Sequence, residues 1–223
     1  MQLVAEALRK DFFRSSGSSN FFTAVYEVNF TLEEGSLVEI CGRSGSGKTT
    51  LLNMLSGLLT PTSGRVLLGN DDLYAMNDKA RSRARNRSIG VIPQGQSALH
   101  SLTVRENVVL PIELYGKQAD GARVDMLLER VGIAHLANVR PSELSGGEMR
   151  RMAIARALAG DAPIIMADEP TGDLDDENTE IVLTLLREIA HAGRAVLLVT
   201  HEAEAAKYAD AVYRMNAGVL ERQ

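Results

Sequence analysis

Residues Gly42 to Thr49 read Gly-Arg-Ser-Gly-Ser-Gly-Lys-Thr and match G-x-x-x-x-G-K-[ST], a pattern typical of phosphate-binding loops. Glycines let the backbone curl tightly, so that several N–H groups can point at phosphate oxygens. Lys48 can reach the β- and γ-phosphates, and the Thr49 hydroxyl can ligate Mg²⁺. The residues predicted to hold the phosphates are Gly42, Ser44, Gly45, Gly47, Lys48, Thr49 and Thr50.

The segments on either side of this loop agree with that interpretation. Leu37–Cys41 is an apolar run of strand type, and the residues from Thr50 to Leu55 contain no Gly or Pro, which predicts a helix. A helix that opens at Gly47 would add the positive end of its dipole to the site. A chance Gly/Ser-rich turn would not be expected between such a strand and such a helix.

Two acidic residues, Asp168 and Glu169, directly follow the apolar run Ile164–Ala167, which is typical of a buried parallel strand. Functional groups gather where the strands of an open α/β sheet end, so we expect both carboxylates near the phosphates. We assign Asp168 to Mg²⁺ and Glu169 to the attacking water as general base. A pair of helix N-caps is the alternative, but it would account for only one acid before Pro170.

Gln94 and His201 stand at two further strand ends, after the apolar segments Ile89–Ile92 and Ala195–Val199. A neutral amide at Gln94 can ligate Mg²⁺ or position water. A single histidine is more often structural, but the place of His201, parallel to those of Asp168 and Gln94, favours a contact with the γ-phosphate.

A second helix start lies at Ser145–Glu148, where Ser145 and Glu148 form a capping box around Gly146 and Gly147. Such a start is a second potential anion site. One bound nucleotide does not need two of them, and the residues alone leave the purpose of the second site open.

The pattern of elements predicts an α/β fold, in which a P-loop NTPase core with a mostly parallel sheet carries an N-terminal antiparallel β layer and an inserted helical subdomain. The strand-type segments Leu3–Leu8 and Val28–Leu32, separated by a polar loop at 14–20, indicate the antiparallel layer. The basic run Lys79–Arg87 predicts a short exposed helix, for which a solvated face is a simpler explanation than a phosphate or lipid-headgroup contact.

We expect residues 1–223 to form a single domain. Residues 1–95 and 141–223 would build a RecA-like core together with the β layer. Residues 100–140 would form the helical subdomain, because a capping box at Thr103–Glu106 predicts a helix there.

The composition limits the possible partners and location. The chain has 223 residues, a net charge of −5 and one cysteine. An acidic balance argues against a nucleic-acid partner, and a single cysteine allows no disulfide within the chain, which suits a reducing compartment. No apolar run approaches the ~20 residues needed to cross a bilayer, and the N-terminus does not resemble a signal peptide. A cytosolic protein that works at a membrane would need a partner that spans it.

These motifs, in this order and over essentially the whole chain, resemble the ATP-binding subunit of an ABC transporter. The segments that carry the resemblance are Gly42–Thr49, Gln94, Leu144–Glu148, Ile164–Glu169, Thr171–Asp175 and His201. The Leu-Ser-Gly-Gly-Glu segment is the specific one, because many other NTPases share the first loop. Within the family, the chain is most similar to ATPases of lipoprotein release, macrolide or peptide efflux, haem export and cell division. Gln96, Met149 and Met152 depart from that pattern.

The resemblance implies a purpose for the second anion site. Two copies would pack head to tail, with each ATP held between Lys48 of one copy and Ser145, Gly146, Gly147 and Glu148 of the other. Phe12 would stack on adenine, and Asp175 would lie at the dimer seam. Residues 100–140 would dock on a multispanning permease, which would hold the protein at the cytoplasmic face of the membrane.

Two other functions remain open at this point. A soluble ABC-type ATPase acting on the ribosome or DNA usually has two ATPase units or a long coiled-coil insertion, whereas this acidic chain has one unit and a short insertion. A small-molecule kinase would share the first loop but would leave Ser145–Glu148 and Gln94 unexplained.

Overall fold

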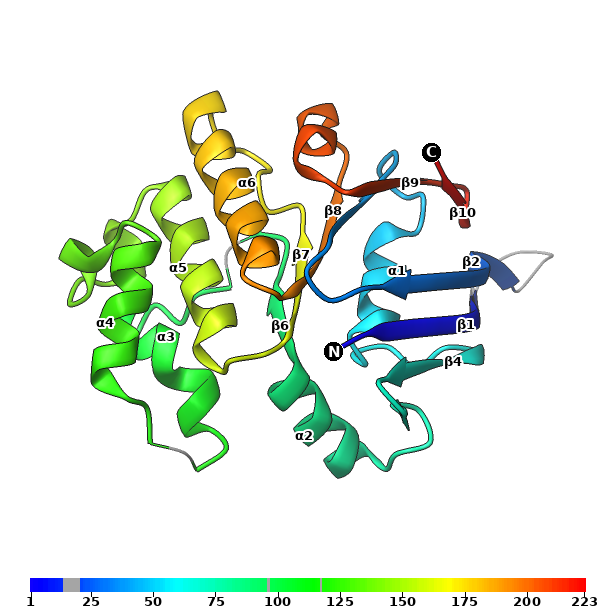
Figure 1. Cartoon of the computed structure of the whole chain (residues 1–223), viewed down its shortest axis with the longest axis horizontal. Coiled ribbons are helices and arrows are strands. Elements are labelled where there is room, and N and C mark those ends of the chain that lie inside the picture. Colours follow the sequence, from blue (N-terminus) through cyan, green and yellow to red (C-terminus); the bar gives the residue numbers. More distant parts are fainter. Residues whose placement is uncertain (14–20, 96, 117) are drawn as a thin grey trace.

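The computed structural model describes residues 1–13, 21–95, 97–116 and 118–223. The polar loop expected at 14–20 and the departure at Gln96 lie outside the described residues. Figure 1 shows a small antiparallel sheet, sheet A, at one end of the long axis and the helices α3 to α5 at the other, with a larger sheet, sheet B, between them.

Sheet B has the strand order β10-β9-β3-β8-β7-β6. Its strands are β3 (Leu37–Cys41), β6 (Ile89–Ile92), β7 (Ile164–Asp168), β8 (Ala195–Thr200), β9 (Ala211–Asn216) and β10 (Val219–Arg222). All neighbouring strands are parallel except β9 and β10, which form a terminal hairpin. Strands β7 and β8 are buried along their whole length, as expected of continuous apolar runs covered on both faces.

Sheet A is antiparallel, with the order β2-β1-β4-β5. Its strands are β1 (Leu3–Phe13), β2 (Phe21–Leu32), β4 (Ser63–Leu68) and β5 (Asp71–Asp72). The predicted antiparallel layer is confirmed, but β1 and β2 are both longer than the sequence pattern indicated. The β1–β2 register shifts at several points, and Ala7 and Glu27 have φ of 46° and 26°. These irregularities break the alternation by which a strand is recognised.

The predicted helices at 50–55 and 79–87 and the predicted starts at Thr103 and Ser145 are all present. The helices are α1 (Lys48–Leu55), α2 (Asp78–Ser88), α3 (Val104–Glu113), α4 (Gly121–Arg130), α5 (Gly146–Ala159) and α6 (Asp176–His191), with 3₁₀ turns η1 (Ala134–Leu136), η2 (Pro141–Glu143) and η3 (Ala203–Tyr208). Both predicted capping boxes form, at Thr103 before α3 and at Ser145 before α5. Helix α2 is the exposed basic helix expected from the sequence. Helix α3 continues past Pro111 to Glu113, so this proline does not end it.

Sheet B separates two hydrophobic cores. Alternate residues of β7 point to opposite faces, so that Ile165 belongs to one core and Met166 to the other. The first core contains apolar side chains of α3, α4, α5 and α6, and the second contains those of α1 and sheet A. Helices α1 and α5, which begin at the two predicted anion sites, therefore pack against opposite faces of sheet B.

Candidate functional site

The loop before α1 has a backbone that requires glycine. Gly47 is the N-cap of α1 with φ 107°, and a Cβ built on it would lie 2.4 Å from the carbonyl oxygen of Ala24. Gly45 also has a positive φ, of 77°. The first N–H groups of α1, from Lys48 to Thr50, have no carbonyl in a preceding turn to bond. The loop therefore presents backbone donors and a helix N-terminus, which is a site for an anion such as a phosphate.

Lys48 is folded back over this loop. Its Nζ donates to the carbonyl oxygens of Gly42 at 2.7 Å and Arg43 at 3.2 Å, and it lies 3.6 Å from Oε1 of Glu169. The residue is only 6% exposed, so its charge is held in a largely desolvated position by these oxygens. Lys48 lines the cavity at the start of α1 whereas Arg43 does not, so the Lys48 ammonium group is placed to meet a phosphate on the N–H groups.

Thr49 and Asp168 bring two oxygen ligands together. The Thr49 hydroxyl donates to Oδ1 of Asp168 at 3.3 Å, across 119 residues of sequence. Burial raises the pKa of Asp168, and the charge of Glu169 adds to this, while the Thr49 bond and the charge of Lys48 act in the opposite direction. A bound cation would favour the ionised carboxylate.

The donor set fits Mg²⁺ rather than a metal held by protein alone. In the described part of the chain, no group of three or more His, Cys, Asp or Glu side chains could hold a metal ion. Mg²⁺ usually takes one or two protein oxygens and completes its shell with water and substrate phosphates. Thr49 and Asp168 could supply those protein oxygens beside the phosphate loop.

One carboxylate oxygen of Glu169 contacts three atoms of Thr200 and His201 at the end of β8. This oxygen, Oε2, lies 2.8 Å from Nδ1 of His201, 3.2 Å from the Thr200 hydroxyl and 3.3 Å from the His201 backbone N. Glu169 has φ of 48° and is 7% exposed. A left-handed backbone at a non-glycine residue is strained, and such strain is often found at functional sites. The His201 side chain, in contrast, is 61% exposed and lines a neighbouring cavity together with Gly42 and Ser44 of the loop.

A cavity of about 460 Å³ contains Phe12, the phosphate loop, Gln94 and Glu169 in its lining. Phe12 stacks on Phe22 with ring centroids 5.5 Å apart, whereas Phe13 is 76% exposed and does not line the cavity. The structure thus brings Phe12 and Gln94, predicted from distant parts of the chain, to one cavity with Lys48.

The cavity also has lining residues that the sequence analysis missed, namely Thr23, Ala24, Tyr26, Ala217 and Gly218. A backbone hydrogen bond of 2.8 Å from Tyr26 N to Gly218 O joins β2 to the β9–β10 turn at this wall. No local motif marks these residues, because they reach the cavity only through the pairing of the chain's two ends.

The second predicted anion site is a separate, exposed helix start. The Ser145 backbone N–H and hydroxyl both donate to Oε2 of Glu148 at 2.8 Å, and the Glu148 N–H returns a bond of 3.3 Å to the hydroxyl. These bonds lower the pKa of Glu148. A Cβ on Gly147 would lie 2.1 Å from Oδ1 of Asn178, so this glycine lets α5 approach α6 closely.

Asp175 lies with this second site and not with the Lys48 cavity. It caps α6 by accepting a bond of 2.8 Å from the Asn178 N–H, which lowers its pKa. Ser145, Gly146, Gly147, Glu148 and Asp175 are all absent from the lining of the Lys48 cavity. Within one copy of the chain, the predicted site residues therefore form two groups.

Comparisons with known proteins agree with this geometry. The family described as "ABC transporter" matches residues 25–172. The chain is 45% identical over 197 residues to the lipoprotein-releasing system ATP-binding protein LolD of Pseudomonas syringae pv. tomato, covering 86% of each chain. It is 40% identical over 199 residues to LolD of Saccharophagus degradans, covering 88% of this chain and 87% of that protein.

Solved structures of an ABC cassette, MJ0796, have the same fold. A structure described as the dimeric form of this bacterial ABC transporter cassette matches with a TM-score of 0.89 and 33% identity, covering 99% of this chain and 98% of that one. A second, described as a post-hydrolysis state bound to ADP and Pi, matches with a TM-score of 0.88, the same identity and the same coverage.

Proposed function

The chain belongs to the ABC transporter family, and from this premise we propose that it hydrolyses ATP to power a membrane export or mechanotransmission complex, most like that of lipoprotein release. The 45% identity to a lipoprotein-releasing ATPase over most of both chains supports this substrate class. The observation that carries the hydrolytic function is a chain of contacts beside the Lys48 cavity. Lys48, Thr49 and Glu169 line this cavity, Thr49 bonds Asp168, and Glu169 pairs with Lys48 and His201.

In this proposal each residue acts on ATP bound at the α1 N-terminus. Lys48 exchanges its carbonyl partners for the β- and γ-phosphates, and Phe12 stacks on the adenine. Thr49, Asp168 and Gln94 would hold Mg²⁺, which when bound would supply positive charge to the phosphates.

Glu169 and His201 act on the attacking water and on the γ-phosphate, respectively. Glu169 accepts a proton from the attacking water, while its bonds to Thr200 and His201 hold the carboxylate in place. His201 contacts the γ-phosphate from the exposed side of the site.

We further propose that the active form is a head-to-tail dimer of two copies. Ser145 is absent from the lining of the cavity that contains Lys48, and α1 and α5 pack on opposite faces of sheet B, so we place the two contacts of one ATP in different copies. The exposed start of α5, with Gly146 and Gly147, would instead meet the ATP of a second copy, and Asp175 would lie beside it at the seam. The dimeric form of the MJ0796 cassette supports this arrangement.

A disulfide cross-link tests the dimer. Cysteines are placed at Ser44 and Ser145 in a chain whose native Cys41 is replaced. We expect a link between two chains, and only when ATP is present. A matched pair at Ser44 and the exposed Ser101 should not link. A Ser44–Ser145 link within a single chain would refute the head-to-tail arrangement.

A mixing experiment gives a functional form of the same test. Chains carrying Lys48→Ala and Ser145→Arg, each inactive alone, are combined. Mixed dimers then contain one composite site with both lesions and one with neither, and they should recover part of the ATPase activity.

The helical region 100–140 is proposed to dock on a multispanning permease at the cytoplasmic face of the membrane. In the described part of the chain no helix is long and apolar enough to span a bilayer. Large apolar side chains are exposed on or near this region, among them Leu99, Leu114, Tyr115 and Met126. In this proposal these side chains contribute apolar contacts to the permease.

Copurification from a detergent extract tests this partner. We expect a multispanning membrane protein to be retained by the wild-type chain and to be lost when Leu114 and Met126 are both changed to Ser. Exposed Ile181 on α6, changed in the same way, is the control. Retention of ribosomes or DNA instead would favour a soluble ABC-type ATPase.

A further inference from the structure

The loop that carries Gln94 leaves sheet B at an edge. Strand β6 is the last strand of the sheet, and its pairing with β7 ends at Ile92 opposite Ala167. Pro93 has no backbone N–H to donate to a ladder. Contacts outside the sheet must therefore hold Gln94, which is exposed in the Lys48 cavity.

Two arginines of α5 supply such contacts. Nη1 of Arg150 donates to the carbonyl oxygen of Pro93 at 3.1 Å, and Nη1 of Arg156 donates to the carbonyl oxygen of Ser97 at 2.8 Å. Arg156 also bonds the Ser97 hydroxyl through Nη2. One helix thus holds the described residues on both sides of Gln94.

The Arg150 contact is the one closest to Gln94. The Pro93 carbonyl and the Gln94 nitrogen belong to the same planar peptide unit, so a bond to that oxygen fixes the plane from which Gln94 departs. Arg150 is only 9% exposed. A guanidinium that is largely buried needs its bonding partners, so this contact is costly to lose.

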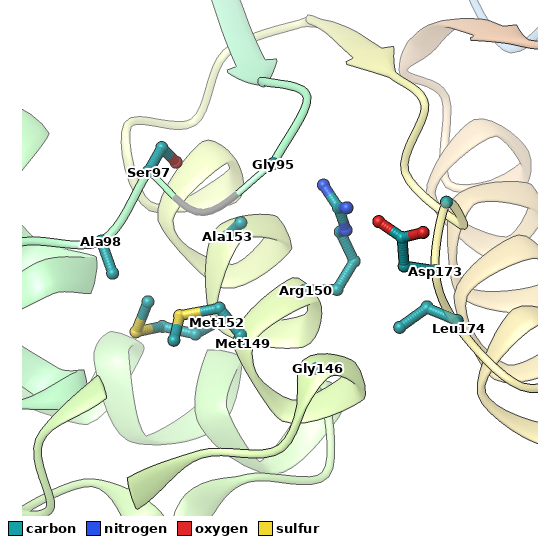
Figure 2. A pocket seen from close by; sticks show the side chains of 11 residues that line it. Gly95, Ser97, Ala98, Gly146, Met149, Arg150, Met152, Ala153, Asp173 and Leu174 are labelled. Carbon is teal, nitrogen blue, oxygen red and sulfur yellow. The ribbon is translucent and has the colours of Figure 1, made fainter. Parts of the chain in front are cut away.

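The charge of Asp173 also reaches Arg150. Burial lowers the pKa of Arg150, and Asp173 acts in the opposite direction. Figure 2 shows the Arg150 guanidinium between the Gly95 segment and the Asp173 carboxylate. Asp173 has φ of 65°, and in the sequence it stands between Glu169 and Asp175. Arg150 therefore faces both the Gln94 loop and the segment that leads to the proposed dimer seam.

The loop is not packed tightly against α5 at this place. A cavity of about 100 Å³ lies between them, lined among others by Gly95, Met149, Arg150, Asp173 and Leu174. Apolar packing across a cavity is weak, because the lining atoms lack neighbours on one side. The bonds from Arg150 and Arg156 connect α5 to this loop beside the cavity, and Ala98 adds apolar packing against the core that contains α5.

We propose that Arg150 is a positioning residue for Gln94 and that it ties the placement of Gln94 in one ATP site to the position of α5, whose first turn serves the other. Arg150 lies five residues after Ser145, roughly 7.5 Å along the helix axis. When the first turn of α5 contacts an ATP, α5 shifts. Arg150 moves with the helix, and its bond to the Pro93 carbonyl moves the Pro93–Gln94 peptide. This inference rests on the proposed function, in which Gln94 acts on Mg²⁺ or water and Ser145 on the ATP of the second copy.

The test is a double-mutant cycle on Arg150 and Gln94, with kcat, the KM for ATP and the Mg²⁺ concentration of half-maximal activity as readouts. Arg150→Ala is expected to lower kcat about tenfold, because a misplaced ligand slows turnover more than it weakens binding. The KM for ATP should change less than about twofold, and more Mg²⁺ should be required. When Gln94→Ala is already present, adding Arg150→Ala should lower kcat only slightly further, because the two residues act as one unit.

Arg194→Ala is the matched control. Arg194 is also a partly buried arginine whose Nη1 donates to a backbone carbonyl, that of Ala162, at 3.1 Å, but it lies away from both sites. It should lower the melting temperature by a similar amount without changing kcat or the Mg²⁺ requirement. Arg150→Lys, which keeps the charge and a donor, should recover most of the turnover. If the alanine variant does not fold, Arg150→Gln takes its place in the same cycle with the same readouts.

The outcomes separate this inference from the proposed function. Unchanged turnover in Gln94→Ala would remove the assigned role of Gln94 and with it the proposed site. Slower turnover in Gln94→Ala with normal kinetics in Arg150→Ala would overturn the inference alone. So would losses that multiply in the double variant, because they would mean that Arg150 acts independently of Gln94.

Discussion

The two groups of site residues are built in different ways. Around Lys48 the charged groups are buried and already bonded to one another, as in the contacts of Lys48 with Glu169 and of Thr49 with Asp168. Around Ser145 the polar groups lie on the surface and satisfy only the start of their own helix. Lys48 must exchange buried carbonyl partners for a ligand. The Ser145 hydroxyl must likewise release Glu148 before it can donate to one, but this exchange takes place at the surface.

This difference explains why the two groups should respond differently to mutation. Removing a side chain from the buried group leaves charges without partners, so both chemistry and local electrostatics change. Removing one from the exposed group costs the fold little. In the proposed dimer, a large loss of activity there would arise at the ATP held by the second copy of the chain.

Glu169→Gln should have the largest effect. The amide cannot accept a proton from water, so we expect turnover to fall by at least about 100-fold. ATP binding should persist, and the proposed dimer should accumulate if hydrolysis is what opens it. Steady-state ATPase assays and size-exclusion chromatography with ATP measure these effects, with exposed Glu177→Gln as the control. Near-normal hydrolysis would sink the general-base assignment.

A second buried acid, Glu39, allows a test of whether burial of a carboxyl group is by itself enough to make it necessary for turnover. Glu39 on β3 is 1% exposed, and its Oε2 has no hydrogen-bond partner among the described residues. Burial raises the pKa of Glu39 from 4.5 to about 7. The folded protein therefore holds the Glu39 proton more tightly than the unfolded chain does. The contribution of this protonation to the free energy of unfolding is full below pH 4.5 and is lost as the pH rises through about 7.

Glu39→Gln should therefore stabilise the protein by up to about 3 kcal/mol at pH 8 and leave it nearly unchanged at pH 4.5. Denaturant unfolding at both pH values measures the difference between this variant and the wild type. The exposed residue Glu180, changed to Gln, should show no such pH dependence. Turnover should be kept, in contrast to Glu169→Gln. An equal stability gain at both pH values would contradict the assigned protonation.

Lys48→Ala should weaken ATP binding by roughly tenfold to a hundredfold, the effect of losing a charge-assisted bond to phosphate. The change also leaves Glu169 without its nearby cation. Titration with labelled ATP measures the affinity, and Lys79→Ala on the exposed helix α2 is the control. Unchanged affinity would mean that the loop does not hold the phosphates.

Ser145→Ala should have the smallest effect on the fold, about 1 kcal/mol from the lost helix cap. Thr103→Ala is a matched control, because Thr103 forms the same kind of capping box before α3. Both variants should lose similar stability, but only Ser145→Ala should slow ATP hydrolysis. Equal ATPase activity in the two variants would indicate that the Ser145 segment is only a helix start.

Local sequence predicted most of the elements. Capping boxes depend on residues three positions apart, so Thr103 and Ser145 identified two helix starts correctly. Continuous apolar runs likewise identified the buried strands β7 and β8. The lengths of β1 and β2 could not be predicted in the same way, because their irregular register is set by pairing between strands and not by alternation within one.

Phosphate loops and strand ends are short local patterns. The sequence alone therefore showed which side chains could do chemistry and at which strand end each of them stands. Only the tertiary structure decided which of them meet. The order β3-β8-β7 brings Thr49 to Asp168, 119 residues away, and puts His201 beside Glu169. The packing of α1 and α5 on opposite faces of sheet B leaves Ser145 outside the lining of the cavity that contains Lys48. Such long-range neighbours depend on how apolar faces are buried together, which no short segment of the chain encodes.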